Sequence, residues 1–111
     1  IFESVSPVVV RKKQSDGSTL YLSPDNVDFI ADLKRNFYEK YKAIYKEEPE
    51  EIEIIPLEEH KKTVTQYKGI WVTGYSGNYN VKGNSKSLEL IYNSGLGIKN
   101  SQGFGLVNII E

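Results

Sequence analysis

The first half of the chain has the hydrophobic pattern of a strand followed by a long helix. Residues 2–10 are rich in β-branched and aromatic side chains and predict a first strand, after which a polar segment with an Asp-Gly pair predicts a turn. Ser23 and Pro24 predict the start of a helix, with Ser23 as its N-cap. The apolar residues that follow recur every three or four positions and predict one buried helical face: Val27, Ile30, Leu33, Phe37, Tyr41 and Ile44.

The second half predicts more strands and a shorter helix. Residues 50–57 alternate acidic and isoleucine side chains, which is the period of a half-buried strand. Residues 63–82 are also β-rich, and their glycines suggest bends or bulges rather than one straight strand. Asn84 is placed to cap a helix that Gly95 ends, and residues 104–110 predict the last strand.

The order of these elements is β-α-β-β-α-β. This order is typical of the ferredoxin-like fold of the α+β class, in which two helices cover one face of an antiparallel four-stranded sheet. The 111 residues, 39% of them hydrophobic, suffice for one core, so residues 1–111 are predicted to form a single domain. Since many unrelated proteins share this fold, function has to be argued from a site.

Composition excludes several kinds of chemistry. The chain has no cysteine and one histidine, His60, so neither a metal site nor a disulfide is expected, and we predict no cofactor. No apolar run is long enough to span a membrane and no signal peptide is evident, which predicts a cytoplasmic protein without a membrane partner. Because the chain begins at Ile1 and contains no methionine, we expect it to be a fragment or processed product, whose catalytic group can lie outside it.

The net charge of −1 hides an asymmetry between the two halves. Residues 1–59 carry 8 basic and 13 acidic side chains, a net charge of −5, whereas residues 60–111 carry 6 basic and 2 acidic side chains, a net charge of +4. The second half therefore has the charge to face phosphate. The alternative is an ordinary solvated surface, which the overall acidic balance favours when charge is considered alone.

A glycine-rich segment at residues 95–105 is the most informative motif. Two Gly-apolar-Gly units flank a polar tip that contains Lys99. Glycines permit positive φ and close backbone approach, so such a loop can present amide N–H groups to phosphate oxygens. Its position after a helix and before a strand excludes the Rossmann and P-loop motifs, and it matches an RRM signature only in part. The alternative is that the glycines only cap the helix and turn the chain.

With this loop in that position, the chain resembles the C-terminal domain of CRISPR repeat-processing endoribonucleases of the RAMP superfamily. That family ends in Gly-apolar-Gly, five residues, and Gly-apolar-Gly before its last strand, and the matching residues here are Gly95, Gly97, Gly103 and Gly105. Residues 6–11 resemble the family's entry strand, and residues 69–77 resemble the stretch before its second helix. The resemblance covers essentially the whole chain.

The resemblance implies two tandem ferredoxin-like domains that bind CRISPR repeat RNA and cut it without a metal. In the family a ribose 2′-OH attacks the adjacent phosphate, and the histidine that acts as general acid or base generally belongs to the N-terminal domain. We therefore expect this chain to be the C-terminal half, with the missing N-terminal domain and the RNA as partners, a possible homodimer, and no catalytic residue of its own. The residues predicted to bind RNA are Gly95, Gly97, Lys99, Asn100, Ser101, Gln102, Gly103 and Gly105, with Arg11 and Lys13.

His60 is the residue most easily mistaken for the catalytic one. It lies among charged residues between two predicted strands, where an exposed loop histidine is expected. Two other functions stay open at this point. The domain could belong to a RAMP subunit that holds guide RNA without cutting it, or it could be a ferredoxin-like regulatory domain that binds a small ligand.

Overall fold

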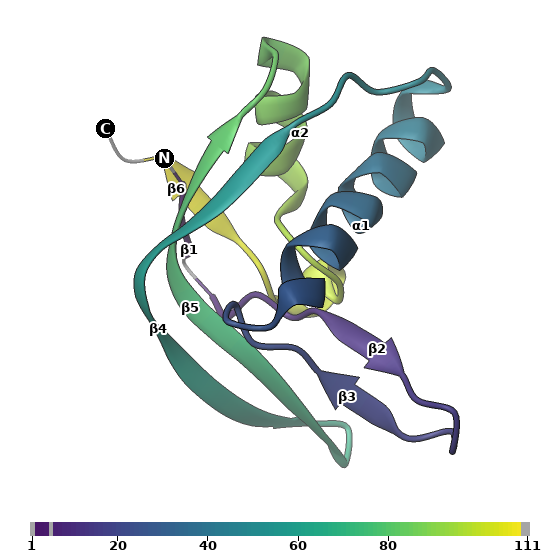
Figure 1. Ribbon diagram of the computed structural model, residues 1–111, viewed down its shortest axis with the longest axis vertical. Coiled ribbons are helices and arrows are strands. Elements are labelled where there is room, and N and C mark those ends of the chain that lie inside the picture. The colour runs from purple at the N-terminus through teal and green to yellow at the C-terminus, as the bar shows by residue number, and fades with distance from the viewer. Residues whose placement is uncertain (1, 5, 110–111) are drawn as a thin grey trace.

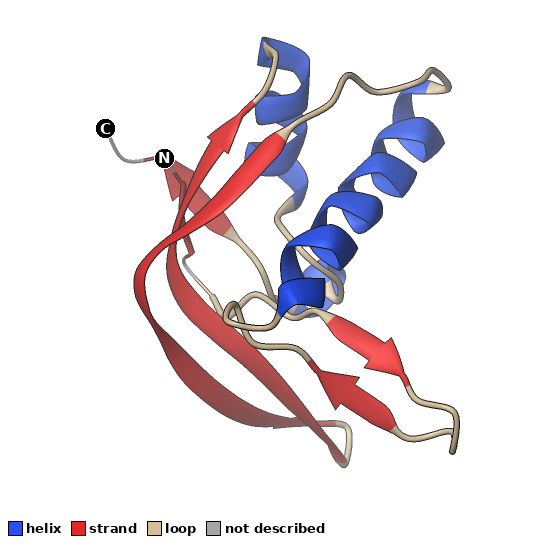
Figure 2. Cartoon of the chain, viewed as in Figure 1, coloured by secondary structure: helices blue, strands red, loops and turns tan. Residues whose placement is uncertain are grey.

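The computed structural model describes residues 2–4 and 6–109 and shows a sheet with both helices on one face (Figures 1 and 2). The strands are β1 (Phe2–Ser4), β2 (Arg11–Lys13), β3 (Thr19–Tyr21), β4 (Glu53–Tyr67), β5 (Ile70–Lys82) and β6 (Val107–Ile109). The helices are α1 (Val27–Tyr45), α2 (Ser85–Ser94) and the single 3-10 turn η1 (Asn100–Gln102).

The main sheet has the strand order β4-β5-β1-β6, and every neighbouring pair is antiparallel. Phe2 on the central strand β1 pairs with Tyr79 on β5 and with Ile109 on β6. This order and the two helices confirm the predicted ferredoxin-like fold. Strands β2 and β3 form a separate two-stranded sheet, which projects beside the start of α1 in Figure 1.

The core lies between α1 and the sheet. Helix α1 buries Phe29, Leu33, Phe37 and Tyr41, and the Phe29 ring stacks with the fully buried ring of Tyr79 at 6.4 Å between centroids. The predicted stripe is therefore right at its centre and wrong at its ends. Val27 is 91% exposed and Ile44 is 53% exposed, because they lie in the first and last turns of the helix.

The predicted helix start is also wrong. Helix α1 begins at Val27, and its N-cap is Asn26, whose side chain accepts a hydrogen bond of 2.8 Å from the Asp28 amide. Ser23 instead closes a turn, because its carbonyl accepts a 2.9 Å hydrogen bond from the Asn26 amide. Ser23 and Asn26 both have side chains suited to an N-cap, and the helix begins after Asn26.

The first strand is shorter than predicted. β1 ends at Ser4, and of the three valines that follow only Val8 forms an isolated bridge, with Tyr75 on β5. The three valines are buried as expected, but the Val9 carbonyl accepts the Ile98 amide of the glycine-rich loop at 2.9 Å. The Val9 carbonyl is thus used by the loop, and β1 does not continue through this segment.

The two predicted β segments at residues 50–57 and 63–82 are arranged differently from the prediction. β4 runs without a break from Glu53 to Tyr67, with a register shift between Leu57 and Lys61. The turn to β5 is made by Lys68 and Gly69, whose φ angles are 49° and 79°. Two positive φ angles in a two-residue hairpin turn are typical of the type I′ turn, which suits the twist of the strands.

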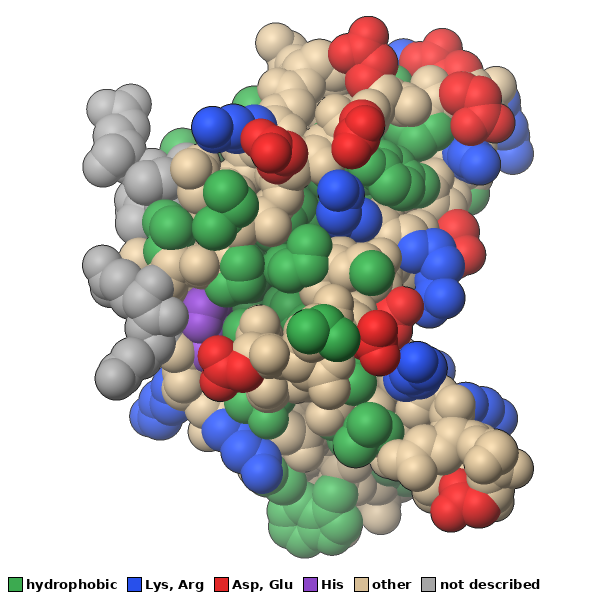
Figure 3. Space-filling model, viewed as in Figure 1, with side chains coloured by type: hydrophobic (Ala, Val, Ile, Leu, Met, Phe, Trp, Pro, Cys, Tyr) green, Lys and Arg blue, Asp and Glu red, His purple; other side chains and the backbone are tan. Residues whose placement is uncertain are grey.

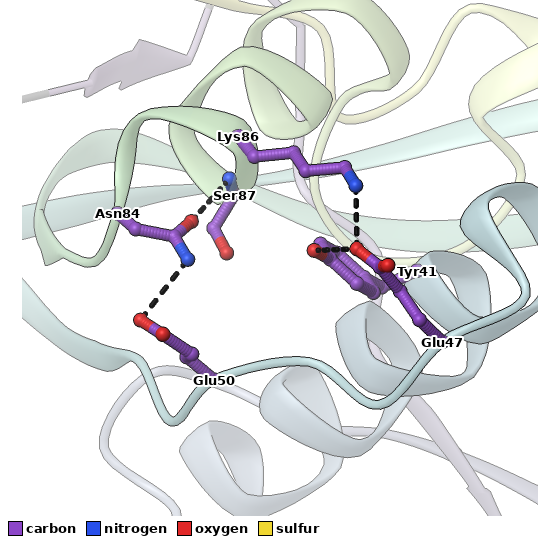
Figure 4. A network of polar contacts seen from close by, with 6 residues as sticks. All are labelled: Tyr41, Glu47, Glu50, Asn84, Lys86 and Ser87. Carbon is purple, nitrogen blue, oxygen red and sulfur yellow. Dashed lines mark hydrogen bonds and ion pairs between the residues drawn. The ribbon is translucent and has the colours of Figure 1, made fainter.

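The predicted boundaries of α2 are confirmed. Asn84 is its N-cap and Gly95 its C-cap. Figure 4 shows that this helix start is also tied to the segment after α1: Asn84 donates a 3.1 Å hydrogen bond to Glu50, and Lys86 forms an ion pair with Glu47. These two contacts join the start of α2 to the segment that follows α1. The last strand is β6, shorter than predicted, and Ile110 lies outside the described residues.

Candidate nucleic-acid interface at the glycine-rich loop

The glycine-rich loop leaves the end of α2, passes through η1 and enters β6. All four motif glycines have positive φ: 90° at Gly95, 76° at Gly97, 96° at Gly103 and 71° at Gly105. Lys99, at the tip, also has a left-handed conformation, with φ of 62°. Residues with a Cβ rarely adopt these angles, so the spacing of the glycines follows from the path of the backbone.

Three of these glycines are also required by close packing. A Cβ on Gly105 would overlap the Leu96 carbonyl oxygen, one on Gly97 would overlap the Val9 carbonyl oxygen, and one on Gly95 would lie 2.7 Å from the Gly105 carbonyl oxygen. Gly103 differs, because nothing lies within 4 Å of the position of its Cβ. Packing therefore requires glycine at the three buried positions, whereas at Gly103 only the positive φ favours glycine.

The two limbs of the loop are hydrogen-bonded to each other and to the segment before β2. The Leu96 amide donates to the Gly105 carbonyl at 2.8 Å, and the Gly105 amide donates to the Pro7 carbonyl at 2.8 Å. Leu96 and Phe104 are buried, and Phe104 packs in a small second core with Val9 and Val72. The loop is therefore a folded part of the domain.

Asn100 lies at the centre of the loop. Its Nδ2 donates to the Leu96 carbonyl at 3.0 Å and to the Phe104 carbonyl at 2.9 Å. Its Oδ1 accepts a 2.7 Å hydrogen bond from Lys40 of α1, whose Nζ also donates to the Gly95 carbonyl at 3.2 Å. Burial lowers the pKa of Lys40 to about 8.

The exposed tip is where a ligand can make contact. Ser101, Gln102 and Gly103 are exposed, and Lys99 is half-buried, whereas Gly95, Gly97 and Gly105 are buried. Whether these residues bind RNA stays a prediction. The structure limits the buried glycines to an indirect part, through the shape of the loop.

Of the two predicted basic residues outside the loop, Arg11 lies beside it. Arg11 and Gly97 line one small cavity of about 50 Å³, together with Arg35 and Glu39 of α1. Lys13 is exposed two residues further along β2. Basic and acidic side chains are interspersed on the face shown in Figure 3, so the charge asymmetry of the sequence does not produce a continuous basic surface there.

His60 is not the exposed loop residue that the sequence suggested. It lies within β4, is half-buried, and its ring is 5.0 Å from the ring of Tyr79. Gly77 leaves the space for it, since a Cβ there would overlap the imidazole. Within residues 2–4 and 6–109, no group of three or more metal-ligating side chains occurs and no helix is long and apolar enough to cross a membrane.

Lys40 is the residue of this site that sequence reasoning missed. It lies between Phe37 and Tyr41 on the edge of the buried face of α1, where a lysine is usually solvated. Its partner Asn100 lies 60 residues away, and no local pattern signals such a contact.

Solved structures with this arrangement are RAMP-type proteins. The chain superposes with a TM-score of 0.90 on a structure described as "An RAMP protein binding different RNA substrates", at 26% identity over 99% of this chain and 48% of that one. A structure described as "CRISPR associated protein Cas6" gives a TM-score of 0.89 at 30% identity, over 99% of this chain and 48% of that one. The chain is thus a ferredoxin-like domain of the RAMP class.

The sequence comparisons specify the family. The model of "CRISPR associated protein Cas6, C-terminal" matches residues 1–109, and the chain belongs to this family. It is 30% identical to the CRISPR-associated endoribonuclease Cas6 1 of Methanocaldococcus jannaschii over 100% of this chain and 45% of that protein. It is 31% identical to the CRISPR-associated endoribonuclease Cas6 of Pyrococcus furiosus over 97% of this chain and 41% of that protein. The chain therefore spans less than half the length of these curated relatives.

Proposed function

We propose that the protein carrying this chain binds CRISPR repeat RNA and cuts it as a metal-independent endoribonuclease, and that this chain is its C-terminal RNA-binding half. The observation that carries the proposal is a folded glycine-rich loop with an exposed polar tip, in a chain of the Cas6 C-terminal family. Relatives with the same domain are named CRISPR-associated endoribonucleases.

The tip of the loop has suitable groups for binding phosphate. The Lys99 ammonium supplies a positive charge, and the exposed side chains of Ser101 and Gln102 supply hydrogen bonds. Arg11 borders the same loop and extends the donor set with a guanidinium group. Such contacts fix the position of an RNA backbone without reading its sequence.

We propose that the proton-transfer group lies in an N-terminal domain outside this chain. Cleavage requires that a ribose 2′-OH loses its proton and attacks the adjacent phosphorus, while the 5′-oxygen leaves with a proton, which yields a cyclic phosphate. A histidine is suited to both transfers near neutral pH. The only histidine of this chain, His60, is half-buried in β4 against Tyr79, which is a poor place to meet an RNA phosphate.

The test is to incubate labelled repeat RNA, in a metal chelator, with the whole protein, with this 111-residue chain, and with its His60→Ala variant. The expected result is that the whole protein yields products with cyclic-phosphate ends and this chain binds without cutting. Cutting by the chain that disappears in His60→Ala would place the active site in this domain and refute the division of labour.

A non-cleaving RNA-binding subunit is the second candidate function. It is favoured by the similarity to the RAMP protein described as binding different RNA substrates. The same experiment separates the two, because RNA binding by the whole protein without any chelator-resistant product would support the second function. If the domain instead regulates through a small ligand, neither the whole protein nor this chain should bind repeat RNA.

A further inference from the structure

We infer that Lys40 and Asn100 are a positioning pair, which holds the glycine-rich loop in the conformation that presents Lys99 to RNA. The inference rests on the proposed RNA-binding function and assigns these two side chains a role within it. Neither is expected to touch the RNA. Asn100 acts inside the loop, and Lys40 acts from α1.

The hydrogen bonds of Asn100 join the two limbs of the loop. Its two N–H donors go to Leu96 on the first limb, at 3.0 Å, and to Phe104 on the second, at 2.9 Å. Its carbonyl oxygen accepts from Lys40 at 2.7 Å. Both donors and the acceptor are used, so the orientation of the amide is fixed and it has no donor to offer a phosphate.

Two of the motif glycines leave room for this amide. A Cβ on Gly105 would lie 2.7 Å from Asn100 Nδ2, and a Cβ on Gly95 would lie 2.9 Å from it. Both distances are shorter than side-chain carbon atoms tolerate next to a nitrogen. The glycines and the asparagine therefore form one arrangement, in which the glycines accommodate the amide that links the limbs.

Lys40 anchors this arrangement to the body of the domain. Its Nζ donates to Asn100 and, at 3.2 Å, to the Gly95 carbonyl. Phe37 and Tyr41, on the same part of α1, are buried in the main core. Hydrogen bonds from a charged, partly buried donor are stronger than neutral ones, so Lys40 ties the loop to α1, whose buried face belongs to the main core.

The position of Lys99 follows from these contacts. Lys99 immediately precedes Asn100, and its carbonyl accepts the Gln102 amide at 3.0 Å and the Phe104 amide at 3.3 Å. Its left-handed φ of 62° is unfavourable for a lysine and is held by the surrounding bonds. If the pair is broken, Lys99 loses the constraint that fixes its direction.

The experiment uses the whole protein and measures two quantities separately: hydrogen exchange at the loop in the absence of RNA, and affinity for RNA. The variants are Lys40→Met, Asn100→Ala and Asn100→Asp, of which the last keeps the acceptor for Lys40 but loses both donors. Lys34→Met on the same helix and Ile54→Val in the main core serve as controls, for charge and for stability respectively. Hydrogen exchange is measured without RNA at the backbone amides of Leu96 and Gly105, and affinity for repeat RNA is measured at several salt concentrations.

All three variants are expected to exchange faster at the loop and to bind RNA about tenfold more weakly, because each removes at least one of the hydrogen bonds that Lys40 and Asn100 make. The salt slope should change to the same extent in Lys40→Met and Asn100→Ala, because both variants act on RNA only through the position of Lys99. The two controls should leave both measurements unchanged.

Three results would overturn the inference. Unchanged hydrogen exchange at the loop would show that the pair does not order the loop, regardless of any change in RNA affinity. Faster exchange with unchanged RNA affinity would separate loop order from binding. A smaller salt slope in Lys40→Met than in Asn100→Ala would make Lys40 a phosphate contact. Failure of the proposed function itself would look different, since the wild-type protein would not bind repeat RNA at all.

Discussion

Gly105→Ala and Gly103→Ala are a matched pair of substitutions. Both sites have a left-handed backbone conformation, but only Gly105 is closely packed. Both have positive φ, 71° at Gly105 and 96° at Gly103. A Cβ at Gly105 would overlap the Leu96 carbonyl oxygen, whereas a Cβ at Gly103 meets nothing within 4 Å. The difference between the two variants therefore isolates the close packing of the loop.

The expected magnitudes follow from these two contributions. A left-handed conformation costs about 1–2 kcal/mol for a residue with a Cβ, and this applies at both sites. At Gly105 the overlap also displaces the limbs, which removes the bond between Leu96 and Gly105 and weakens the contact with Asn100. At about 1 kcal/mol for each bond, the loss at Gly105 is about 3–4 kcal/mol in total.

The assay is thermal unfolding followed by circular dichroism or calorimetry. For a domain of this size each kcal/mol lowers Tm by about 4 °C, so we expect a decrease of about 12–16 °C for Gly105→Ala and of about 4–8 °C for Gly103→Ala. Equal decreases in the two variants would refute the reasoning, because they would show that backbone conformation alone accounts for the glycines.

Three further predictions concern RNA binding and pH. Lys99→Ala should weaken RNA binding and reduce the salt slope by somewhat less than one unit, and anisotropy titrations at several salt concentrations that show no change would exclude a phosphate contact. Gly103→Val should impair RNA binding more than Asn108→Ala in a filter assay with folded variants, and equal affinities would favour a loop that only turns the chain. The pKa of Lys40 is lowered to about 8 from 10.5, so the unfolded chain binds more protons between these values and the free energy of unfolding should rise with pH there. Urea unfolding at pH 7 and pH 10 should show this rise relative to Lys40→Met, and an identical pH dependence of the two proteins would contradict it.

The parts of the fold that the sequence predicted correctly carry strong local signals. Asn84 and Gly95 delimit α2 as expected, because an N-cap side chain and a C-terminal glycine act on their immediate neighbours. The buried face at the centre of α1 was also predicted correctly, because the helical spacing of apolar residues is a local pattern. The order of strands and helices was enough to identify the ferredoxin-like topology.

The errors occur where tertiary contacts decide local structure. Residues 8–10 have the composition of a strand, yet Val9 bonds to the glycine-rich loop, which is 89 residues further along the chain at Ile98. The sequence predicts His60 between two strands and among charged residues, but β4 continues across it, with a register shift between Leu57 and Lys61. Neither the bond between Val9 and Ile98 nor the position of His60 within a strand is signalled by the residues next to it in the sequence.

The glycine motif is recognisable from the sequence, but the close packing that requires three of its glycines is not. Isolated glycines next to a lysine suggest a backbone that approaches phosphate directly. The structure buries Gly95, Gly97 and Gly105 against carbonyl groups and the Asn100 amide, so these glycines can affect a ligand only through the shape of the tip.

This arrangement separates two demands that a binding loop has to meet. Phosphate contacts require solvated donors, and the tip offers these at Lys99, Ser101 and Gln102. A defined geometry requires buried hydrogen bonds, and these lie at the base, where Lys40 and Asn100 join α1 to both limbs. A loop ordered before binding loses less conformational entropy when the ligand arrives, so in the proposed RNA-binding function we expect the buried half of the motif to contribute to affinity.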